Sequence, residues 1–178
     1  RYGTVTGVQT CALPIWPGVE FSVSATTRAM RPGERDGVDY WFLTREQFLS
    51  RVEKNEFLEW ASYNGNLYGT PRWPMDAAIA AGRTFLLEIE VKGTRQLREK
   101  RVPGLYLFIS PPSLEVLRDR LERRGTNTQD DIDARAKIAE QEMVEAAGEV
   151  GGVPLYDHTL VNLDLDATIR RVEELIRS

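Results

Sequence analysis

The stretch Phe85-Leu-Leu-Glu-Ile-Glu-Val91 is the clearest predicted strand in the sequence. Its odd-numbered residues are all apolar and share one face, whereas Leu86, Glu88 and Glu90 share the other. The strand therefore carries carboxylates towards its C-terminal end. A second segment, residues 105–109, is continuously apolar, as in parallel strands that are covered on both faces, and Pro111-Pro112 ends it.

Helical patterns alternate with strand patterns around these two segments. Further strands are expected at Phe21–Ala25 and Thr159–Val161, and the dipeptide Asn64-Gly65 predicts a tight turn between two more. Helices are expected after Thr44, from Pro74 to Gly82, from Ser113 to Gly125, from Asp130 to Ala147 and after an Asp166 cap. The alternation predicts an α/β fold with a parallel sheet and right-handed crossovers, which binds ligands at the carboxyl ends of its strands.

The first of these helices has the most specific local signal. Thr44 and Gln47 have the Thr-x-x-Gln spacing of a capping box, in which each side chain bonds the other residue's backbone. Phe48, Leu49 and Val52 are expected to form its buried face.

Composition excludes several classes of protein. The 178 residues are 42% hydrophobic and 28% charged, which is typical of one ordinary globular domain. The net charge of −4 argues against nonspecific nucleic-acid binding, and no apolar run approaches the ~20 residues of a transmembrane helix. Because Cys11 is the only cysteine and His158 the only histidine, we expect a cytoplasmic protein without a disulfide framework or a cysteine-based metal site.

The first sixteen residues do not resemble the rest of the chain. Residues 1–16 have neither an amphipathic period nor the features of a signal peptide, and Val5 to Ile15 looks like a reading frame through a synthetic sequencing adapter. We interpret them as a non-native leader; a divergent natural N-terminus is the alternative. The domain is expected to span residues 17–178.

The segment Ser22–Tyr40 gathers hydroxyls and arginines around a glycine-bearing loop. Arg28 and Arg31 offer planar forks that suit phosphate oxygens, and Glu34 could hold one of them in place. This composition is typical of phosphate recognition, although a solvated basic loop has the same residues.

Two later segments add polar groups among apolar ones. Residues 57–60 contain Glu59, and residues 65–70 contain Tyr68 and Thr70. A buried carboxylate is costly unless it is paired, and guanine has two adjacent donors that would pair with it. A surface carboxylate and a core tyrosine are the alternatives for Glu59 and Tyr68.

These segments together resemble the guanylate kinase family, in order and at family spacing. The resemblance rests on the motifs SVSATTR, RPGE and DY, followed by FLEW, GNxYGTP and RGT, and it covers nearly everything from Pro17 onward. It implies a P-loop-kinase-like parallel sheet core flanked by helices, with a small mixed α/β GMP-binding lobe and a helical lid. The lobe is expected at about residues 22–84, the core at about 85–120 and 153–178, and the lid at about 121–150.

The resemblance also implies roles for individual residues. The expected clamp on the GMP phosphate consists of Arg28, Arg31, Tyr40 and Tyr68, supported by Glu34. The expected guanine readers are Ser24, Glu59 and Thr70. Glu90 is also expected to bind GMP: it falls at a strand end where the family more often has aspartate, near the metal and the acceptor.

Three arginines match those that contact the ATP phosphates: Arg120, Arg124 and Arg135. The implied reaction is phosphoryl transfer from ATP to GMP in purine nucleotide metabolism, with Mg²⁺ carried by the nucleotide and no metal site on the protein. Such a reaction needs the two nucleotides held in line and their charge neutralised. The expected partners are GMP and ATP, with no nucleic acid and no membrane.

The family's phosphate loop, Gly-x-x-x-x-Gly-Lys-[Ser/Thr], has no match in the printed sequence, whose first lysine is Lys54. We therefore predict that these 178 residues do not make GDP at a useful rate, because nothing replaces the loop's cradle of amides and its lysine. A coupled ADP-release assay checks this, and ordinary kinase turnover would contradict it.

A different class of function remains open. A guanylate-kinase-like binding module would use the same pocket for a phosphorylated partner without ATP chemistry. The arginines of the expected lid and the guanine-reading residues favour the enzyme. Glu59 and Thr70 also disfavour a kinase for AMP or UMP, because adenine presents the opposite hydrogen-bonding pattern.

Overall fold

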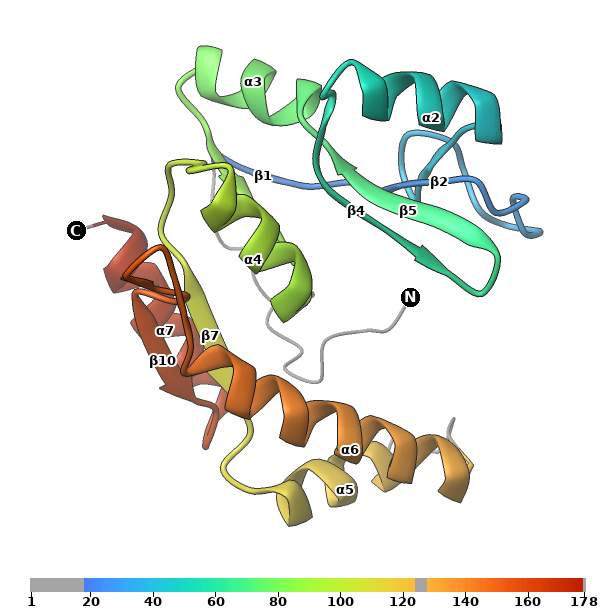
Figure 1. Cartoon of the computed structure of the whole chain (residues 1–178). Coiled ribbons are helices and arrows are strands. Elements are labelled where there is room, and N and C mark those ends of the chain that lie inside the picture. The colour runs from blue at the N-terminus through green and yellow to red at the C-terminus, as the bar shows by residue number, and fades with distance from the viewer. Residues whose placement is uncertain (1–17, 124–127, 178) are drawn as a thin grey trace. The chain divides into compact units, whose positions relative to one another are not determined.

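The computed structural model describes residues 18–123 and 128–177. They fall into two compact units, one ending at Leu97 and the other beginning at Arg98 (Figure 1). The predicted leader at residues 1–16 lies outside the described residues. Within the described residues, none of the helices is both long and apolar enough to cross a bilayer.

The first unit contains two sheets. One is a parallel pair of β1 (Val19–Phe21) and β6 (Thr84–Leu86). The other is a mixed four-stranded sheet in the order β3-β2-β5-β4, built from β2 (Ala25–Thr26), β3 (Trp41–Phe42), β4 (Phe57–Tyr63) and β5 (Asn66–Pro71). Strand β2 runs parallel to β3 and antiparallel to β5. Three helices complete this part of the chain: α2 (Arg45–Glu53), α3 (Trp73–Ala80) and α4 (Val91–Glu99), in which the boundary between the units falls.

Local signals placed several elements of this unit correctly. Thr44 and Gln47 form the predicted capping box, with Thr44 N–H to Gln47 Oε1 at 2.9 Å and Gln47 N–H to Thr44 Oγ1 at 3.2 Å. The predicted turn at Asn64-Gly65 joins β4 to β5, and both residues have positive φ, as a tight hairpin turn requires. Pro74 lies in the first turn of α3.

The core of this unit lies between α2 and the mixed sheet. Phe48 is fully buried and stacks on Phe57 with ring centroids 4.3 Å apart. Val52 packs against the same cluster, but Leu49 is 40% exposed, so its predicted place on the buried face is wrong. Phe48 and Val52, four residues apart, already fill the narrow strip of helix that faces the sheet.

Two strand predictions are corrected. Residues 21–25 do not form one strand: β1 ends at Phe21, and β2 begins at Ala25 in the other sheet. The predicted strand at residues 85–91 is paired only as far as Leu86, because its partner β1 ends opposite it, and Val91 already begins α4. The length of a strand depends on its partner strand, and β1, the partner of β6, lies far away in the sequence.

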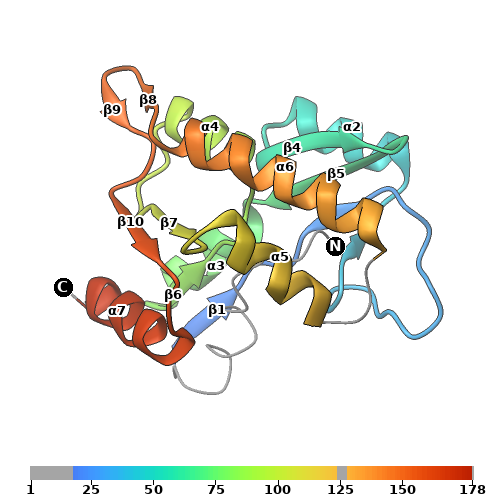
Figure 2. The same cartoon turned by 90° about the horizontal axis from the view of Figure 1, so that it is seen from below.

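The second unit has a parallel pair of strands, β7 (Leu107–Ser110) and β10 (His158–Val161). It also contains α5 (Leu114–Arg123), α6 (Gln129–Ala146), the short strands β8 (Glu149–Val150) and β9 (Val153–Pro154), and α7 (Leu165–Arg177). Figure 2 shows α5 alongside α6 and α7 beside β10. Leu117 and Leu121 of α5 pack against Ile132 of α6, all three at most 3% exposed.

Helix boundaries in this unit follow side-chain caps. Ser113 Oγ accepts from Val116 N–H at 3.2 Å, which confirms the predicted cap of α5. The predicted cap Asp166 is wrong: Asp164 Oδ1 accepts from Ala167 N–H at 2.8 Å and α7 begins at Leu165. Both aspartates suit a cap, and the observed one lies three residues before its donor, where a capping side chain reaches.

Asp157 holds the start of β7. Its Oδ2 accepts from Tyr106 N–H and its Oδ1 from Arg98 Nη2, both at 2.7 Å, and the Arg98 guanidinium lies 3.7 Å from the Tyr106 ring centroid. Because the Tyr106 amide bonds this side chain, β7 begins at Leu107, two residues later than predicted. Burial acts to raise the pKa of Asp157, but these hydrogen bonds outweigh it and hold the pKa below its ordinary value.

We predict that Asp157→Asn lowers the free energy of unfolding by about 1 kcal/mol at pH 7, since it weakens two hydrogen bonds of a partly exposed carboxylate. A carboxylate with a depressed folded pKa contributes stability above its unfolded pKa and loses it as pH falls through the folded pKa. The difference between wild type and variant should therefore shrink below about pH 4. Urea unfolding of both proteins between about pH 7 and pH 3 measures this difference. Asp119→Asn, an exposed change on α5, is the control. A difference that does not depend on pH would contradict the prediction.

Candidate functional site

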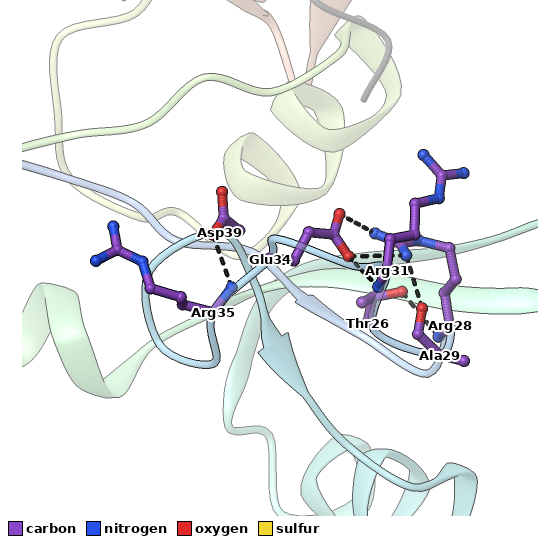
Figure 3. Close-up of polar contacts among 7 residues, drawn as sticks. All are labelled: Thr26, Arg28, Ala29, Arg31, Glu34, Arg35 and Asp39. Carbon is purple, nitrogen blue, oxygen red and sulfur yellow. Dashed lines mark hydrogen bonds and ion pairs between the residues drawn. The ribbon is translucent and has the colours of Figure 1, made fainter.

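The first unit brings together a cluster of arginine, carboxylate and aromatic side chains. The Arg28 guanidinium makes a bidentate pair with Glu34: Nη2 to Oε1 at 2.7 Å and Nη1 to Oε2 at 3.0 Å (Figure 3). Both side chains are less than one-fifth exposed. Glu34 also accepts from the Arg31 backbone N–H at 2.7 Å, so one carboxylate shapes the whole turn.

These bonds perturb both partners of the pair. The hydrogen bond from Arg28, followed by the one from the Arg31 backbone, lowers the pKa of Glu34. The hydrogen bond to Glu34 raises the pKa of Arg28 in turn, so the pair is fully ionised at neutral pH. A guanidinium held in this way presents a fixed positive charge with little freedom left to lose on binding an anion.

Aromatic rings surround the Arg28 guanidinium. Its Cζ lies 5.4 Å from the Tyr40 ring centroid and 5.7 Å from that of Phe42. Tyr68 meets Tyr40 edge-on with centroids 6.2 Å apart. The cluster therefore contains four of the five residues predicted for the phosphate clamp: Arg28, Glu34, Tyr40 and Tyr68.

Arg31 takes part differently from the prediction. Its backbone bonds Glu34, but its side chain is exposed, and Figure 3 shows the guanidinium pointing away from that carboxylate. In the described residues Glu34 therefore orients the Arg28 guanidinium and the Arg31 backbone.

A second polar pair lies where β4 meets β5. Glu59 and Thr70 are opposite each other in the register, and Thr70 Oγ1 donates to Glu59 Oε1 at 2.6 Å. Thr70 is 1% exposed and Glu59 is partly buried. Glu59 is therefore neither fully exposed nor without a hydrogen-bond partner.

The arginine cluster and the Glu59–Thr70 pair each contribute one residue to the same face of β5. Tyr68 and Thr70 are two residues apart on this strand, and side chains at that spacing point to the same side. Ser24 precedes β2, the strand that pairs with β5, and its carbonyl accepts from Trp41 N–H at 2.9 Å. One strand thus connects a cationic cluster to a carboxylate that accepts hydrogen bonds.

Glu90 is less constrained. Its side chain is exposed just before α4, while its carbonyl accepts from Thr94 N–H at 3.0 Å.

The second unit places two of the predicted arginines. Arg120, in the last turn of α5, donates from Nη2 to the Asn162 carbonyl at 2.8 Å, just after β10. This is the carboxyl end of a parallel pair, where α/β sheets bind ligands. Arg135 is partly buried on α6, and its charge helps to lower the pKa of Asp131, although the hydrogen bond from Thr128 is the larger cause. Arg124 lies outside the described residues.

Sequence reasoning missed three contributors in the first unit. Phe42 provides the second ring against Arg28, and Gly93 and Gln96 bring α4 against β4 beside Glu59. Gly93 lies just after the predicted strand at residues 85–91, and its own segment gave no signal of the close approach to Glu59.

The comparisons with known proteins agree on one family. The guanylate kinase family model matches residues 17–178. The guanylate kinase of Synechocystis sp. is 46% identical over 155 residues, 87% of this chain and 78% of its own length, and that of Latilactobacillus sakei is 42% identical over 158 residues, 89% and 74%. The crystal structure of guanylate kinase from Anaplasma phagocytophilum superposes with a TM-score of 0.68 at 34% identity, covering 96% of this chain and 79% of that one. The fold and the family expected from the sequence motifs are confirmed, and the chain belongs to the guanylate kinase family, whose members are ATP:GMP phosphotransferases.

Proposed function

We propose that the face of β5 in the first unit is the GMP site of this guanylate kinase. The Arg28–Glu34 pair, with Arg31, Tyr40 and Tyr68, would bind the phosphate, and Ser24, Glu59 and Thr70 would read guanine. The observation that carries the proposal is the placement of Tyr68 and Thr70 on one face of one strand, which joins an oriented cation to an oriented carboxylate.

The chemistry of Glu59 accounts for the choice of base. A carboxylate accepts two hydrogen bonds, and guanine offers a ring N–H and an amino group side by side. Thr70 already donates to Oε1, so the acceptor is held in place before a nucleotide arrives. Adenine presents an acceptor at the ring position and would leave the partly buried carboxylate without a donor.

The arginines of the second unit have the complementary role. Phosphoryl transfer requires positioning and charge neutralisation more than covalent chemistry by the protein. We propose that Arg120, Arg124 and Arg135 contact the ATP phosphates. The carbonyl of Asn162 fixes Arg120 at a strand end, so little side-chain freedom remains to be lost there.

The expected ion is Mg²⁺, which arrives on the nucleotide and neutralises phosphate charge during transfer. Among residues 18–123 and 128–177, no group of three or more His, Cys, Asp or Glu could hold a metal ion. We propose that Glu90, whose exposed carboxylate lies just before α4, belongs to the GMP site near the acceptor.

We further propose the arrangement expected from the sequence: a GMP lobe at about 22–84, a core at about 85–120 and 153–178, and a lid at about 121–150. A lid that closes over the nucleotides would keep water from the ATP phosphates. We place the enzyme in the cytoplasm, with GMP and ATP as its partners.

Calorimetric titration of the 178-residue chain with GMP and AMP tests the proposal. We expect GMP to bind and AMP to bind at least a hundredfold more weakly. Binding of a phosphorylated peptide that displaces GMP at lower concentration would instead favour the binding module.

A further inference from the structure

The edge strand β4 is irregular immediately before Glu59. Phe57 lies opposite Pro71 and Glu59 opposite Thr70, so Leu58 is an extra residue on β4, and it is fully buried. A bulge of this kind changes the direction of the side chain that follows it. The position of the Glu59 carboxylate therefore depends on what holds this bulged edge.

The side chain of Gln96, on α4, holds the bulged edge of β4. Trp60 N–H donates to Gln96 Oε1 at 3.2 Å, and Gln96 Nε2 donates to the Trp60 carbonyl at 3.1 Å. The side-chain amide thus takes both hydrogen bonds that a neighbouring strand would supply to Trp60. Because β4 is the last strand of its sheet, these groups have no strand partner on that side.

Gly93 lies three residues earlier on α4, on the same face of the helix. A Cβ atom at this buried position would lie 3.2 Å from Glu59 Cγ and 3.4 Å from its Oε2. The helix backbone therefore rests directly on the Glu59 side chain, while Thr70 bonds its other oxygen.

We propose that Gln96 is a positioning residue for base selection, holding the bulged edge of β4 against α4 so that Glu59 faces the guanine site, with Gly93 providing the room. The inference rests on the proposed role of Glu59 in reading guanine. Gln96 itself need not touch the nucleotide.

The test compares three ligands on the full chain: GMP, AMP and ribose 5-phosphate, which has the phosphate but no base. Gln96→Leu keeps the side-chain bulk and the helix propensity but removes both bonds to Trp60. We expect the GMP:AMP affinity ratio to fall about tenfold, as when one charge-assisted hydrogen bond is weakened, while ribose 5-phosphate binds unchanged. Gln141→Leu, an exposed change on α6, is the matched control.

A second variant separates positioning from stability. Gly93→Ala raises the helix propensity of α4, so a purely structural role predicts a more stable helix and unchanged binding. We expect instead a several-fold fall in the GMP:AMP ratio, because the new methyl group displaces Glu59. Thr44→Ala, which removes the α2 cap, shows whether lost stability alone changes the ratio.

The outcomes distinguish this inference from the proposed function. If Glu59→Gln collapses the GMP:AMP ratio and Gln96→Leu leaves it unchanged, the positioning role is wrong and the guanine site stands. If Glu59→Gln leaves the GMP:AMP ratio unchanged, the proposed guanine site is wrong, and the positioning role that rests on it is wrong as well. Equal losses for all three ligands in Gln96→Leu would show a structural role only.

Discussion

Replacing Glu59 by glutamine should lower the GMP:AMP affinity ratio by about a thousandfold. The carboxylate accepts two hydrogen bonds, whereas a glutamine amide accepts at one atom and donates from the other. The amide N–H group then meets a donor of guanine, whereas the same N–H group can donate to the ring nitrogen of adenine. The variant should therefore lose GMP affinity and gain AMP affinity together.

Glu56→Gln is the matched control. It makes the same chemical change three residues earlier, at a carboxylate that pairs with Arg51 at 2.7 Å and has no predicted role in binding. Calorimetric titration of both variants with GMP and AMP measures the ratio. If the two substitutions change it equally, Glu59 does not read the base.

Elements with short-range signals could be predicted from the sequence. The capping box at Thr44 and Gln47, the turn at Asn64-Gly65 and the cap at Ser113 each depend on residues at most three apart, and the structure confirms all three. The Arg28–Glu34 pair was also predictable, because both residues lie on one short loop.

Features that depend on distant partners could not be predicted in this way. The extent of β6 is set by β1, more than sixty residues earlier in the chain, so the alternating pattern at residues 87–90 gave no strand. Gln96 bonds Trp60 from 36 residues away, and nothing in its own segment identifies it. The Thr70–Glu59 bond was likewise visible only once the hairpin register was known.

Replacing Arg28 by alanine should lower GMP affinity by two to three orders of magnitude while guanosine binds as before. The guanidinium is the oriented cation of the cluster, and charge-assisted bonds to a phosphate contribute about 1.5–3 kcal/mol each. The variant also leaves the Glu34 carboxylate unpaired beside the phosphate, which adds repulsion. The GMP affinity of Arg28→Lys should lie between those of the wild type and Arg28→Ala, because an ammonium group keeps the charge but cannot make the bidentate pair.

Guanosine is the control ligand, since it keeps the base and lacks the phosphate. Arg35→Ala is the control variant, since the side chain of Arg35 is exposed and this residue bonds Asp39 through its backbone N–H and carbonyl. Glu34→Gln should lower GMP affinity by about tenfold, less than Arg28→Ala, because it loosens the guanidinium without removing its charge. Arg28 also packs against Tyr40 and Phe42, so its loss could act through the aromatic cluster. Equal losses for GMP and guanosine would show that Arg28 acts through this packing and not through the phosphate.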